Sequence, residues 1–391
     1  MFLLFYPFCA IIPRIMSHIE GRVARITSDL EKLVAISSVS GNEQTIGNEI
    51  AIQSREYGHE VHQLGKEVAV LIPGKNRKKA FILNGHTDTV DSEGWTSDRL
   101  RMHEENGRLV GLGTTDMKSG LAIMLDVARE AQDAEPPCDV WLMFTSGEEI
   151  DGAGAKKVTT WFDETQRQNY DTVGGLILEP THRDDGDYVG FGHRSSAFVH
   201  VSVEGPGGHG SRDYSRGAPP AIPTLARFFA DLPEIQAEWA DRYSGDLGQP
   251  TLNGSNFDAG TGSVNVVPGV ATGTVDLRVT PELYPKLPRL MDGLRRKYGV
   301  KIEHKPVQKP SQCPQESVIY QVVKDVLPEV PFEVFPGATD MVHFEEHGIP
   351  MLIYGPGDPG IMHEPGESVA VSAIQNTVVN VDKVLAAFAE R

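Results

Sequence analysis

The chain has 391 residues with a formal net charge of −18, and 40% of its residues are hydrophobic. This length exceeds that of one comfortable hydrophobic core, so we expect two domains, and the composition excludes collagen-like, disordered and disulfide-scaffold proteins. So acidic a surface repels phosphates and anionic lipid heads, which argues against nucleic acid and membrane surfaces as partners.

The N-terminal residues and the cysteines bear on the cellular compartment of the protein. Residues 2–12 are strongly apolar, but they are too short to span a bilayer, which takes about 20 apolar residues. No basic residue precedes them as in a signal peptide, so we expect residues 1–16 to be an unstructured extension, with Met16 as the working start and a targeting segment as the alternative. Cys9, Cys138 and Cys313 form no CxxC motif, which favours a reducing, cytoplasmic location.

The first part of the chain alternates between helical and strand patterns. Apolar residues recur at helical spacing over His18–Val34, Ser40–Glu43 offers a cap for a second helix, and a third helix is predicted over Gly120–Gln132. Four short apolar runs are typical of strands buried on both faces: Val68–Ile72, Ala80–Leu83, Val140–Phe144 and Leu176–Leu178. This alternation predicts an α/β domain with a helix-covered, mostly parallel sheet.

From about Asp184 the pattern changes to that of a smaller, inserted domain. Strands are predicted over Ala197–Glu204, Leu252–Asp258, Thr272–Val279 and Val300–His304, with helices over Ala221–Leu232 and Pro281–Tyr298. This order, β-α-β-β-α-β, predicts a ferredoxin-like unit. We therefore expect a main domain of residues 17–184 and 309–391 that is interrupted by residues 185–308.

Side chains that can bind metal ions follow the predicted strands. In Asn84–Asp88, strand alternation puts His86 and Asp88 on one side, so that the carboxylate can orient the imidazole toward an ion. A turn with a hydrogen-bonded histidine is the alternative. In Gly111–Lys118 a tight loop presents Asp116 just before a helix, where a helix N-cap is the alternative.

Three further motifs follow or end apolar runs. Glu148 and Glu149 come after one strand, Glu179 ends another, and His363 follows the run Met351–Ile353. Adjacent glutamates near a core need a cation, although a solvated surface pair is the alternative. Ligand sites in open α/β sheets lie at the carboxyl ends of strands. Two histidines and three carboxylates there predict two divalent ions, Zn²⁺ most readily, with Co²⁺ or Mn²⁺ as alternatives.

With these motifs the sequence resembles the M20 metallopeptidases, in particular the acetylornithine deacetylase and succinyl-diaminopimelate desuccinylase group. The resemblance runs from about Ile19 onward, and its motifs occur in the family's order: His86-Thr87-Asp88, Gly113–Lys118, Glu148-Glu149, Glu179-Pro180-Thr181 and His363. It implies that His86, Asp116 and Glu179 hold one metal ion and that Asp116, Glu149 and His363 hold the other, with Asp116 bridging. Asp88 would orient His86, and Glu148 would be the general base. The chain departs from the family at Leu112, where arginine is common, and at Ser119, where glycine is usual; neither is a ligand.

The resemblance also implies roles within the inserted domain. In the family this domain forms a dimer, so a homodimer is implied, and His209, displayed by a glycine-rich turn, would reach the partner's active site to stabilise an oxyanion. A structural loop is the alternative for His209. Arg278 would bind a substrate carboxylate or, alternatively, form a surface salt bridge with Asp276. Arg194 and Asn265 match further substrate-contacting positions of the family, and Thr339, which lies beyond the inserted domain, belongs to a loop that resembles one lining the same pocket.

The reaction implied by this resemblance is metal-assisted hydrolysis of an amide, in which Glu148 takes a proton from water and passes it to the leaving amine. We therefore expect a dinuclear zinc amide hydrolase that removes the acyl group from an N-acylated amino acid, similar to acetylornithine deacetylase. A dipeptidase or aminopeptidase of the same family, acting on short peptides, is the alternative. A metal-free binding scaffold is a further alternative, but such a scaffold would not need to keep Glu148.

Overall fold

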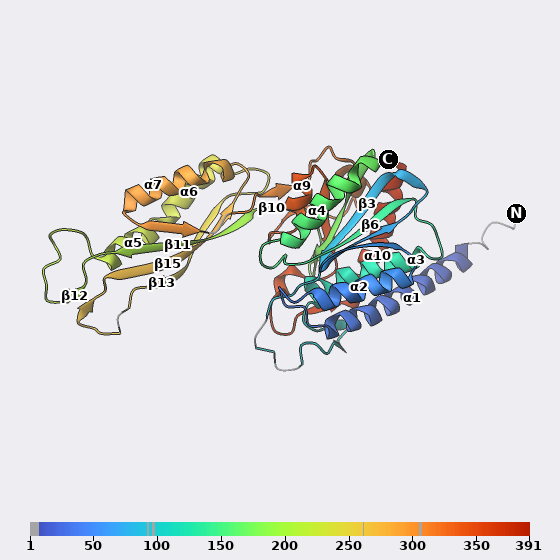
Figure 1. Cartoon of the computed structure of the whole chain (residues 1–391), viewed down its shortest axis with the longest axis horizontal. Coiled ribbons are helices and arrows are strands. Elements are labelled where there is room, and N and C mark those ends of the chain that lie inside the picture. Colours follow the sequence, from blue (N-terminus) through green and yellow to red (C-terminus); the bar gives the residue numbers. More distant parts are fainter. Residues whose placement is uncertain (1–7, 92–93, 96–97, 261, 305–306) are drawn as a thin grey trace. The chain divides into compact units, whose positions relative to one another are not determined.

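The computed structural model describes residues 8–91, 94–95, 98–260, 262–304 and 307–391. They form two compact units, whose elements are labelled in Figure 1. Among the described residues, the first unit comprises those up to Phe191, Gln312–Glu333 and Thr339–Arg391, and the second comprises Gly192–Ser311 and Val334–Ala338. Each unit has a hydrophobic core of its own.

A nine-stranded sheet forms the centre of the first unit, and four of its strands contain the four apolar runs of the sequence. The strands pair in the order β1-β2-β6-β3-β7-β19-β10-β17, and β18 pairs with β10. Their bounds are β1 Glu60–Leu64, β2 Glu67–Ile72, β3 Asn76–His86, β6 Cys138–Thr145, β7 Thr172–Pro180, β10 Val189–His193, β17 Ser311–Gln312, β18 Phe332–Phe335 and β19 Met351–Gly355.

This sheet is mixed, which corrects our prediction of a mostly parallel sheet. β3 is parallel to β6 and β7, and β7 is parallel to β19, whereas β1–β2, β2–β6 and β10–β19 are antiparallel. Only Gly65 and Lys66 join β1 to β2, and so short a turn connects antiparallel strands. An apolar run reads the same in either direction, so the sequence of β2 carries no sign of its orientation.

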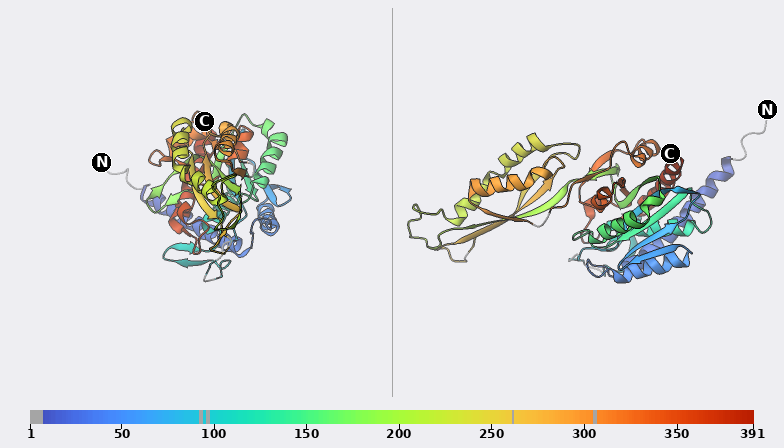
Figure 2. Two further views of the ribbon diagram at one scale, coloured as in Figure 1. Left: turned by 90° about the vertical axis from the view of Figure 1, so that its left-hand side faces the viewer. Right: turned by 45° about the horizontal axis from the view of Figure 1, so that its top comes forward.

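Helices cover both faces of the sheet, as Figures 1 and 2 show. On one face, Phe81 and Val140 share a core with α1, α2, α3, α8 and α10. On the other face, Trp141 packs edge-on against Phe162 of α4. The bounds are α1 Phe8–Ala35, α2 Gln44–Glu56, α3 Ser119–Glu130, α4 Ala153–Thr165, α8 Val318–Val326, α9 Met341–Glu346 and α10 Val371–Glu390.

One helix start and one helix cap differ from our predictions. α1 begins at Phe8 rather than at His18, because a stretch that is apolar all round has no helical periodicity to mark its start. Residues 1–7 of the expected extension lie outside the described residues. At α2 the N-cap residue is Glu43, whose side chain makes no capping bond to the helix and instead accepts the N–H of Gly41 at 2.8 Å.

The parallel strands bring four chain segments to one edge of the sheet, where β3, β6, β7 and β19 end at His86, Thr145, Pro180 and Gly355. A short turn, η1 Thr114–Lys118, leads into α3 beside this edge. Next to η1 lies a small antiparallel sheet of β4 His103–Glu105, β5 Arg108–Val110 and β20 Ser368–Ala370. The edge and the turn η1 carry the side chains that the sequence marks as metal ligands.

The second unit has a four-stranded antiparallel sheet in the order β13-β15-β11-β16, with helices packed against it (Figure 1). The elements in chain order are β11 Ser195–Glu204, α5 Ala221–Ala230, α6 Leu232–Tyr243, β13 Thr251–Asp258, β15 Val270–Val279, α7 Leu287–Tyr298 and β16 Lys301–His304. We did not predict α6. Pro233 lies in its first turn, where proline is tolerated, so the proline accompanies a new helix rather than a loop.

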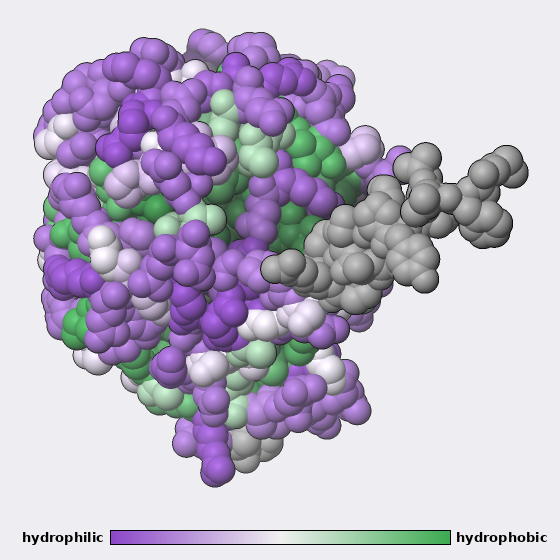
Figure 3. Space-filling view, turned by 90° about the vertical axis from the view of Figure 1, so that its right-hand side faces the viewer, coloured by the Kyte–Doolittle hydropathy of each residue, from purple (hydrophilic) through white to green (hydrophobic). Residues whose placement is uncertain are grey.

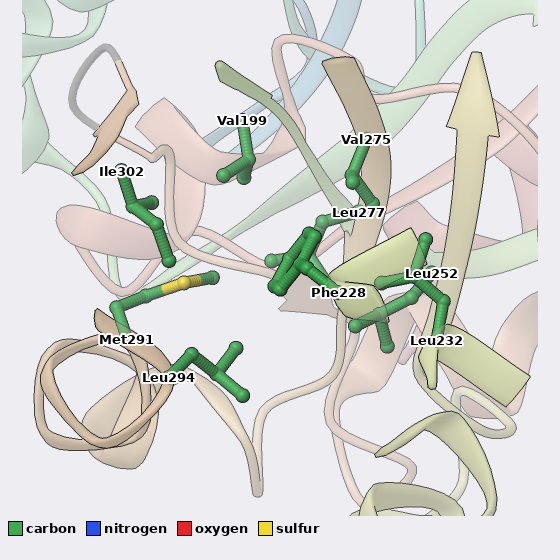
Figure 4. Close-up of a pocket in the computed structure, with 9 residues that line it drawn as sticks. All are labelled: Val199, Phe228, Leu232, Leu252, Val275, Leu277, Met291, Leu294 and Ile302. Carbon is green, nitrogen blue, oxygen red and sulfur yellow. The ribbon is translucent and has the colours of Figure 1, made fainter. Parts of the chain in front are cut away.

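Apolar side chains of the sheet and helices meet in the core of the second unit (Figure 4). Val199, Val275 and Leu277 from the strands and Phe228 and Met291 from the helices line a cavity of about 10 Å³. An apolar space of this size is a packing gap with no room for a ligand.

The remaining short elements are β8 His182–Arg183, β9 Gly186–Asp187, β12 Gly208–His209, β14 Val266–Val267, η2 Arg167–Asn169, η3 Tyr284–Lys286 and η4 Pro359–Ile361. The face in Figure 3 is mostly hydrophilic, with apolar residues in small patches between polar ones. Within the described ranges, no helix combines the length and the apolar character that crossing a bilayer requires.

Candidate metal centre

The first group of possible metal ligands forms where β3 and β7 end. His86 is buried, and its Nδ1 lies 3.0 Å from the carbonyl oxygen of Asp88 and 3.5 Å from Asp88 Oδ1. With Nδ1–H donating in that direction, Nε2 faces Asp116 Oδ1 at 2.8 Å and Glu179 Oε1 at 3.4 Å. The arrangement therefore gathers one imidazole nitrogen and two carboxylates around a single point.

The second group shares Asp116 with the first. His363 Nε2 lies 3.0 Å from Asp116 Oδ2 and 2.9 Å from Glu149 Oε1. Within each group, the candidate ligand atoms all lie within 4.8 Å of one another. Asp116 thus offers one oxygen to each group, and the side chain of His363, which is 46% exposed, is the most open member of the second.

Two backbone features support these groups. A Cβ at Gly355 would lie 2.1 Å from the carbonyl oxygen of Leu178, so only glycine lets β19 approach β7 this closely beside Glu179. His363 has φ +64, in the left-handed region that residues other than glycine seldom adopt. Such a backbone conformation persists only where the surrounding structure enforces it, and these conformations cluster at functional sites.

The charged groups of the site shift one another's pKa values. Burial raises the pKa of Glu179 to about 7, and the negative charge of Asp116 adds to the rise. Hydrogen bonds to Asp116 and Glu149 raise the pKa of His363 to about 10. Burial acts to lower the pKa of His86, but the carboxylates of Glu179 and Asp116 raise it well above its ordinary value. The site therefore attracts positive charge, and its nitrogen and oxygen donors fit divalent cations.

Glu148 differs from its neighbour Glu149, because Glu149 belongs to the second ligand group whereas Glu148 belongs to neither. Burial raises the pKa of Glu148 well above its ordinary value, against the opposing charge of His86, and Glu179 and Glu149 raise it further. A carboxyl group that holds a proton readily, beside a cluster of ligands, has the properties of a proton carrier.

Asp88 does more than lie beside His86. Its buried carboxylate accepts the backbone N–H groups of Glu148 and Glu149, each at 3.2 Å, and the hydroxyl of Ser40 at 2.8 Å. Asp88 therefore fixes the loop that carries both glutamates as well as facing the imidazole. No local pattern indicates these bonds, since they join positions that are 60 and 61 residues apart.

Sequence reasoning missed two buried carboxylates. Asp340 accepts the hydroxyl of Thr145 at 2.6 Å, and burial raises the pKa of Asp340. Glu367 accepts backbone N–H groups of the loop that carries Asp116. Asp340 adjoins Thr339, which we did name and which is buried, with Oγ1 accepting the N–H of Met341 at 3.2 Å. The only local signal for Glu367 was its position shortly after His363.

The other predicted site residues lie in the second unit, and two of them lie at a small two-stranded sheet formed by β12 and β14. His209 is exposed in β12, which pairs with β14, and its Nδ1 lies 2.8 Å from Ser211 Oγ. Asn265 immediately precedes β14, and its carbonyl oxygen accepts the N–H of Gly210 at 2.8 Å. This two-stranded sheet therefore holds His209 and Asn265 next to each other.

Two arginines lie close together on the sheet of the second unit. Arg278 Nε is 3.0 Å from Asp276 Oδ1, which is the salt bridge that we named as the alternative for this residue. Arg194 donates to the carbonyl oxygen of Gln249 at 2.8 Å, and burial, together with the charge of Arg278, lowers the pKa of Arg194. Both guanidinium groups therefore already have partners within their own unit.

Comparison with known proteins adds independent information on this chain. Residues 82–390 match the model of a family described as peptidase family M20/M25/M40. An acetylornithine deacetylase from Pectobacterium carotovorum is 27% identical over 321 residues, which cover 79% of this chain and 80% of that protein. A tripeptidase structure from Staphylococcus aureus has a TM-score of 0.73 at 19% identity and covers 94% of this chain and 99% of that one. A dinuclear metal binding peptidase of the M20 family from Bacillus subtilis has a TM-score of 0.65 at 16% identity, with coverages of 94% and 98%.

The chain belongs to peptidase family M20/M25/M40, because the family model matches most of its length. This confirms the resemblance that we drew from the strand-end motifs. The chain is accordingly a metal-dependent hydrolase of amide bonds, and the two ligand groups agree with metal use. The two solved structures show that the fold is shared.

Proposed function

We propose that the chain is a two-metal amide hydrolase that removes the acyl group from an N-acylated amino acid, as an acetylornithine deacetylase does. The observation that carries this proposal is the placement of Asp116, whose two carboxylate oxygens face His86 and His363 separately. A carboxylate shared between two ligand groups is what a site for paired ions needs. The similarity to a curated acetylornithine deacetylase supports the substrate class.

The chain's own residues supply a complete donor set. His86, Asp116 and Glu179 would hold one ion, and Asp116, Glu149 and His363 would hold the other. Imidazole and carboxylate donors suit Zn²⁺, and Co²⁺ or Mn²⁺ can take the same ligands. When bound, such ions polarise an amide carbonyl and acidify water in the site.

Glu148 would carry the proton between water and the leaving amine. It belongs to neither ligand group, and burial, together with the charges of Glu179 and Glu149, raises its pKa, which suits it to hold a proton in transit. Since Asp88 fixes the N–H groups of both Glu148 and Glu149, the two side chains can take different directions from one loop. One of them can then act as a ligand while the other faces water.

The second unit would provide dimerisation and substrate contacts. In this proposal residues 185–308 form a ferredoxin-like dimerisation and lid domain, and the exposed His209 acts in the active site of the partner subunit as an oxyanion donor. The position of His209 in the exposed, glycine-flanked strand β12 supports this role. Arg278 would bind the substrate carboxylate, since a guanidinium fork matches that group. Arg194 and Asn265 of this unit would provide further contacts, and Thr339 of the first unit would provide another.

A dipeptidase or aminopeptidase is the second candidate function. The similarity to the tripeptidase structure favours it, because the same site can cleave a peptide bond. A metal-free binding scaffold is a weaker candidate, because the chain keeps both ligand groups together with Glu148. We also propose a cytoplasmic location, which the buried, unpaired thiols of Cys138 and Cys313 support.

Metal analysis of the purified protein, combined with turnover of acetylornithine, succinyl-diaminopimelate and glycine dipeptides side by side, tests the proposal. We expect about two ions per chain, as a two-metal site requires, and the highest kcat/KM on the acylated amino acid. Faster turnover of the dipeptides would favour the second candidate. A protein with neither bound metal nor turnover would favour the scaffold.

A further inference from the structure

A buried carboxylate outside both ligand groups holds the loop that carries Asp116. Glu367 is only 1% exposed. Its Oε1 accepts the backbone N–H of Thr115 at 2.8 Å and that of Asp116 at 2.9 Å, and its Oε2 accepts that of Gly113 at 3.1 Å. Three backbone donors of one tight loop therefore converge on one side chain from a distant part of the sequence.

The backbone around Glu367 ties down the same loop. The carbonyl oxygen of Glu367 accepts the N–H of Gly111 at 3.1 Å and the hydroxyl of Thr114 at 3.3 Å. The carbonyl oxygen of Ser368 accepts the hydroxyl of Thr115 at 2.7 Å, and Ser368 is the register partner of Val110 in the β20–β5 pair. The loop is therefore held along its length by a single opposing segment.

This opposing segment also supplies a candidate ligand. His363 precedes Glu367 by four residues, and its Nε2 lies 3.0 Å from Asp116 Oδ2. Asp116 must present one oxygen to each ligand group, so a small rotation of its backbone would displace both oxygens at once. Groups that orient ligands in this way control metal affinity although they do not touch the ion.

We propose that Glu367 is a positioning residue for Asp116: its carboxylate sets the backbone orientation in which Asp116 is shared between the two ligand groups. The inference rests on the two-metal function proposed above. A purely structural anchor would affect folding but leave metal affinity unchanged. The same unit offers such an anchor in Asp139, a buried carboxylate near the amino end of β6 that accepts the N–H of Gly74 at 2.9 Å and the hydroxyl of Tyr170 at 3.0 Å.

The test compares Glu367→Gln with Asp139→Asn, each in the full chain. Whichever way its amide turns, glutamine at position 367 faces at least one of the three backbone donors with an N–H group. Each protein is stripped of metal with a chelator and titrated with Co²⁺ and with Zn²⁺ by calorimetry. Thermal unfolding of the metal-free protein and the visible absorption spectrum of the Co²⁺-loaded protein are recorded in parallel.

We expect Glu367→Gln to weaken metal binding by about 10–100-fold and to change the Co²⁺ spectrum. Asp139→Asn is expected to lower thermal stability while metal affinity and spectrum stay as in the unaltered chain. Unchanged metal affinity in Glu367→Gln overturns the inference, even if its stability falls.

Should Glu367→Gln fail to fold, Glu367→Asp is titrated in the same way. Aspartate keeps the charge but is one methylene shorter, so it cannot reach all three donors, and weaker metal binding is again expected. Unchanged affinity in folded Glu367→Asp overturns the inference as well. If the unaltered chain itself binds no metal, both the proposed function and this inference are refuted. If the unaltered chain binds metal and only the Glu367 variants contradict the expectation, this inference alone is refuted.

Discussion

Replacing Asp88 by alanine removes the acceptor for two backbone N–H groups, those of Glu148 and Glu149, and for the hydroxyl of Ser40. An unsatisfied buried donor costs about 1–3 kcal/mol. Both N–H groups are partly buried, so we take the lower part of that range, which gives about 2–4 kcal/mol for the pair. We therefore expect Asp88→Ala to lower the free energy of unfolding of the first unit by this amount, while the unit still folds.

The unfolding free energy is measured with urea in the presence of a chelator, because bound metal would add its own stabilisation and mask the effect. Ser40→Ala is the matched control, since it removes only one of the three hydrogen bonds and is expected to cost about 1 kcal/mol or less. Burial acts to raise the pKa of Asp88, but hydrogen bonds to His86, Ser40 and Glu149 lower it overall. The difference in unfolding free energy between Asp88→Ala and the unaltered chain is therefore fully present above the ordinary pKa of aspartate. This difference shrinks as the pH falls below that pKa.

Asp88→Ala is also expected to weaken metal binding and activity by about 10–100-fold, since it frees the imidazole of His86 and the loop of the two glutamates together. Calorimetric titration with Zn²⁺ and steady-state kinetics measure these effects. If Asp88→Ala costs no more than Ser40→Ala in unfolding free energy and binds metal normally, the hydrogen bonds described for Asp88 do not hold this loop.

Three other substitutions test the proposed roles. Glu148→Ala should leave metal content nearly intact and lower kcat by about 10²–10⁴-fold; loss of metal with activity retained per bound ion would make Glu148 a ligand instead. Asp116→Ala should weaken both metal sites in a titration, because each oxygen of Asp116 faces a different histidine; a loss as small as that of Asp88→Ala would refute the shared carboxylate. His209→Ala should lower kcat by about 10²–10³-fold, and mixing it with Glu148→Ala should restore activity, since one site of a mixed dimer would contain both residues. Absence of recovery, with subunit exchange verified by mass spectrometry, would place His209 in its own chain's site or outside catalysis.

Local pattern was sufficient to predict the strands that end at the site. The run Ala80–Leu83 lies within β3, which ends at His86, and Leu176–Leu178 lies within β7, which carries Glu179. Because parallel strands finish at one edge, the prediction that these side chains gather followed from strand ends alone. The structure brings His86, Asp116 and Glu179 together, while their roles as ligands stay a prediction.

What the sequence could not provide depends on pairing between distant segments. The hydrophobic run of β2 carries no direction, so the antiparallel β2–β6 pair was unpredictable. The bonds from Glu367 to Gly113 and Asp116 span more than 250 positions, and a lone glutamate in a polar loop gives no sign of them. The helix α6 was missed for a different reason: Pro233 lies in its first turn, and because proline both ends helices and begins them, this residue alone does not indicate which of the two occurs.

The order of segments in the first unit has a consequence for biosynthesis. β19 lies between β7 and β10 in the sheet, yet it follows both of them along the chain, and the second unit is translated in between. A ribosome adding about 5–20 residues per second needs about 10–30 s to travel from Pro180 to Met351. During that time the nascent β7 has no neighbour on one edge, a state that invites aggregation and chaperone binding. The second unit can fold within this interval, whereas the pairing of His363 with Asp116 must wait until translation has passed residue 363.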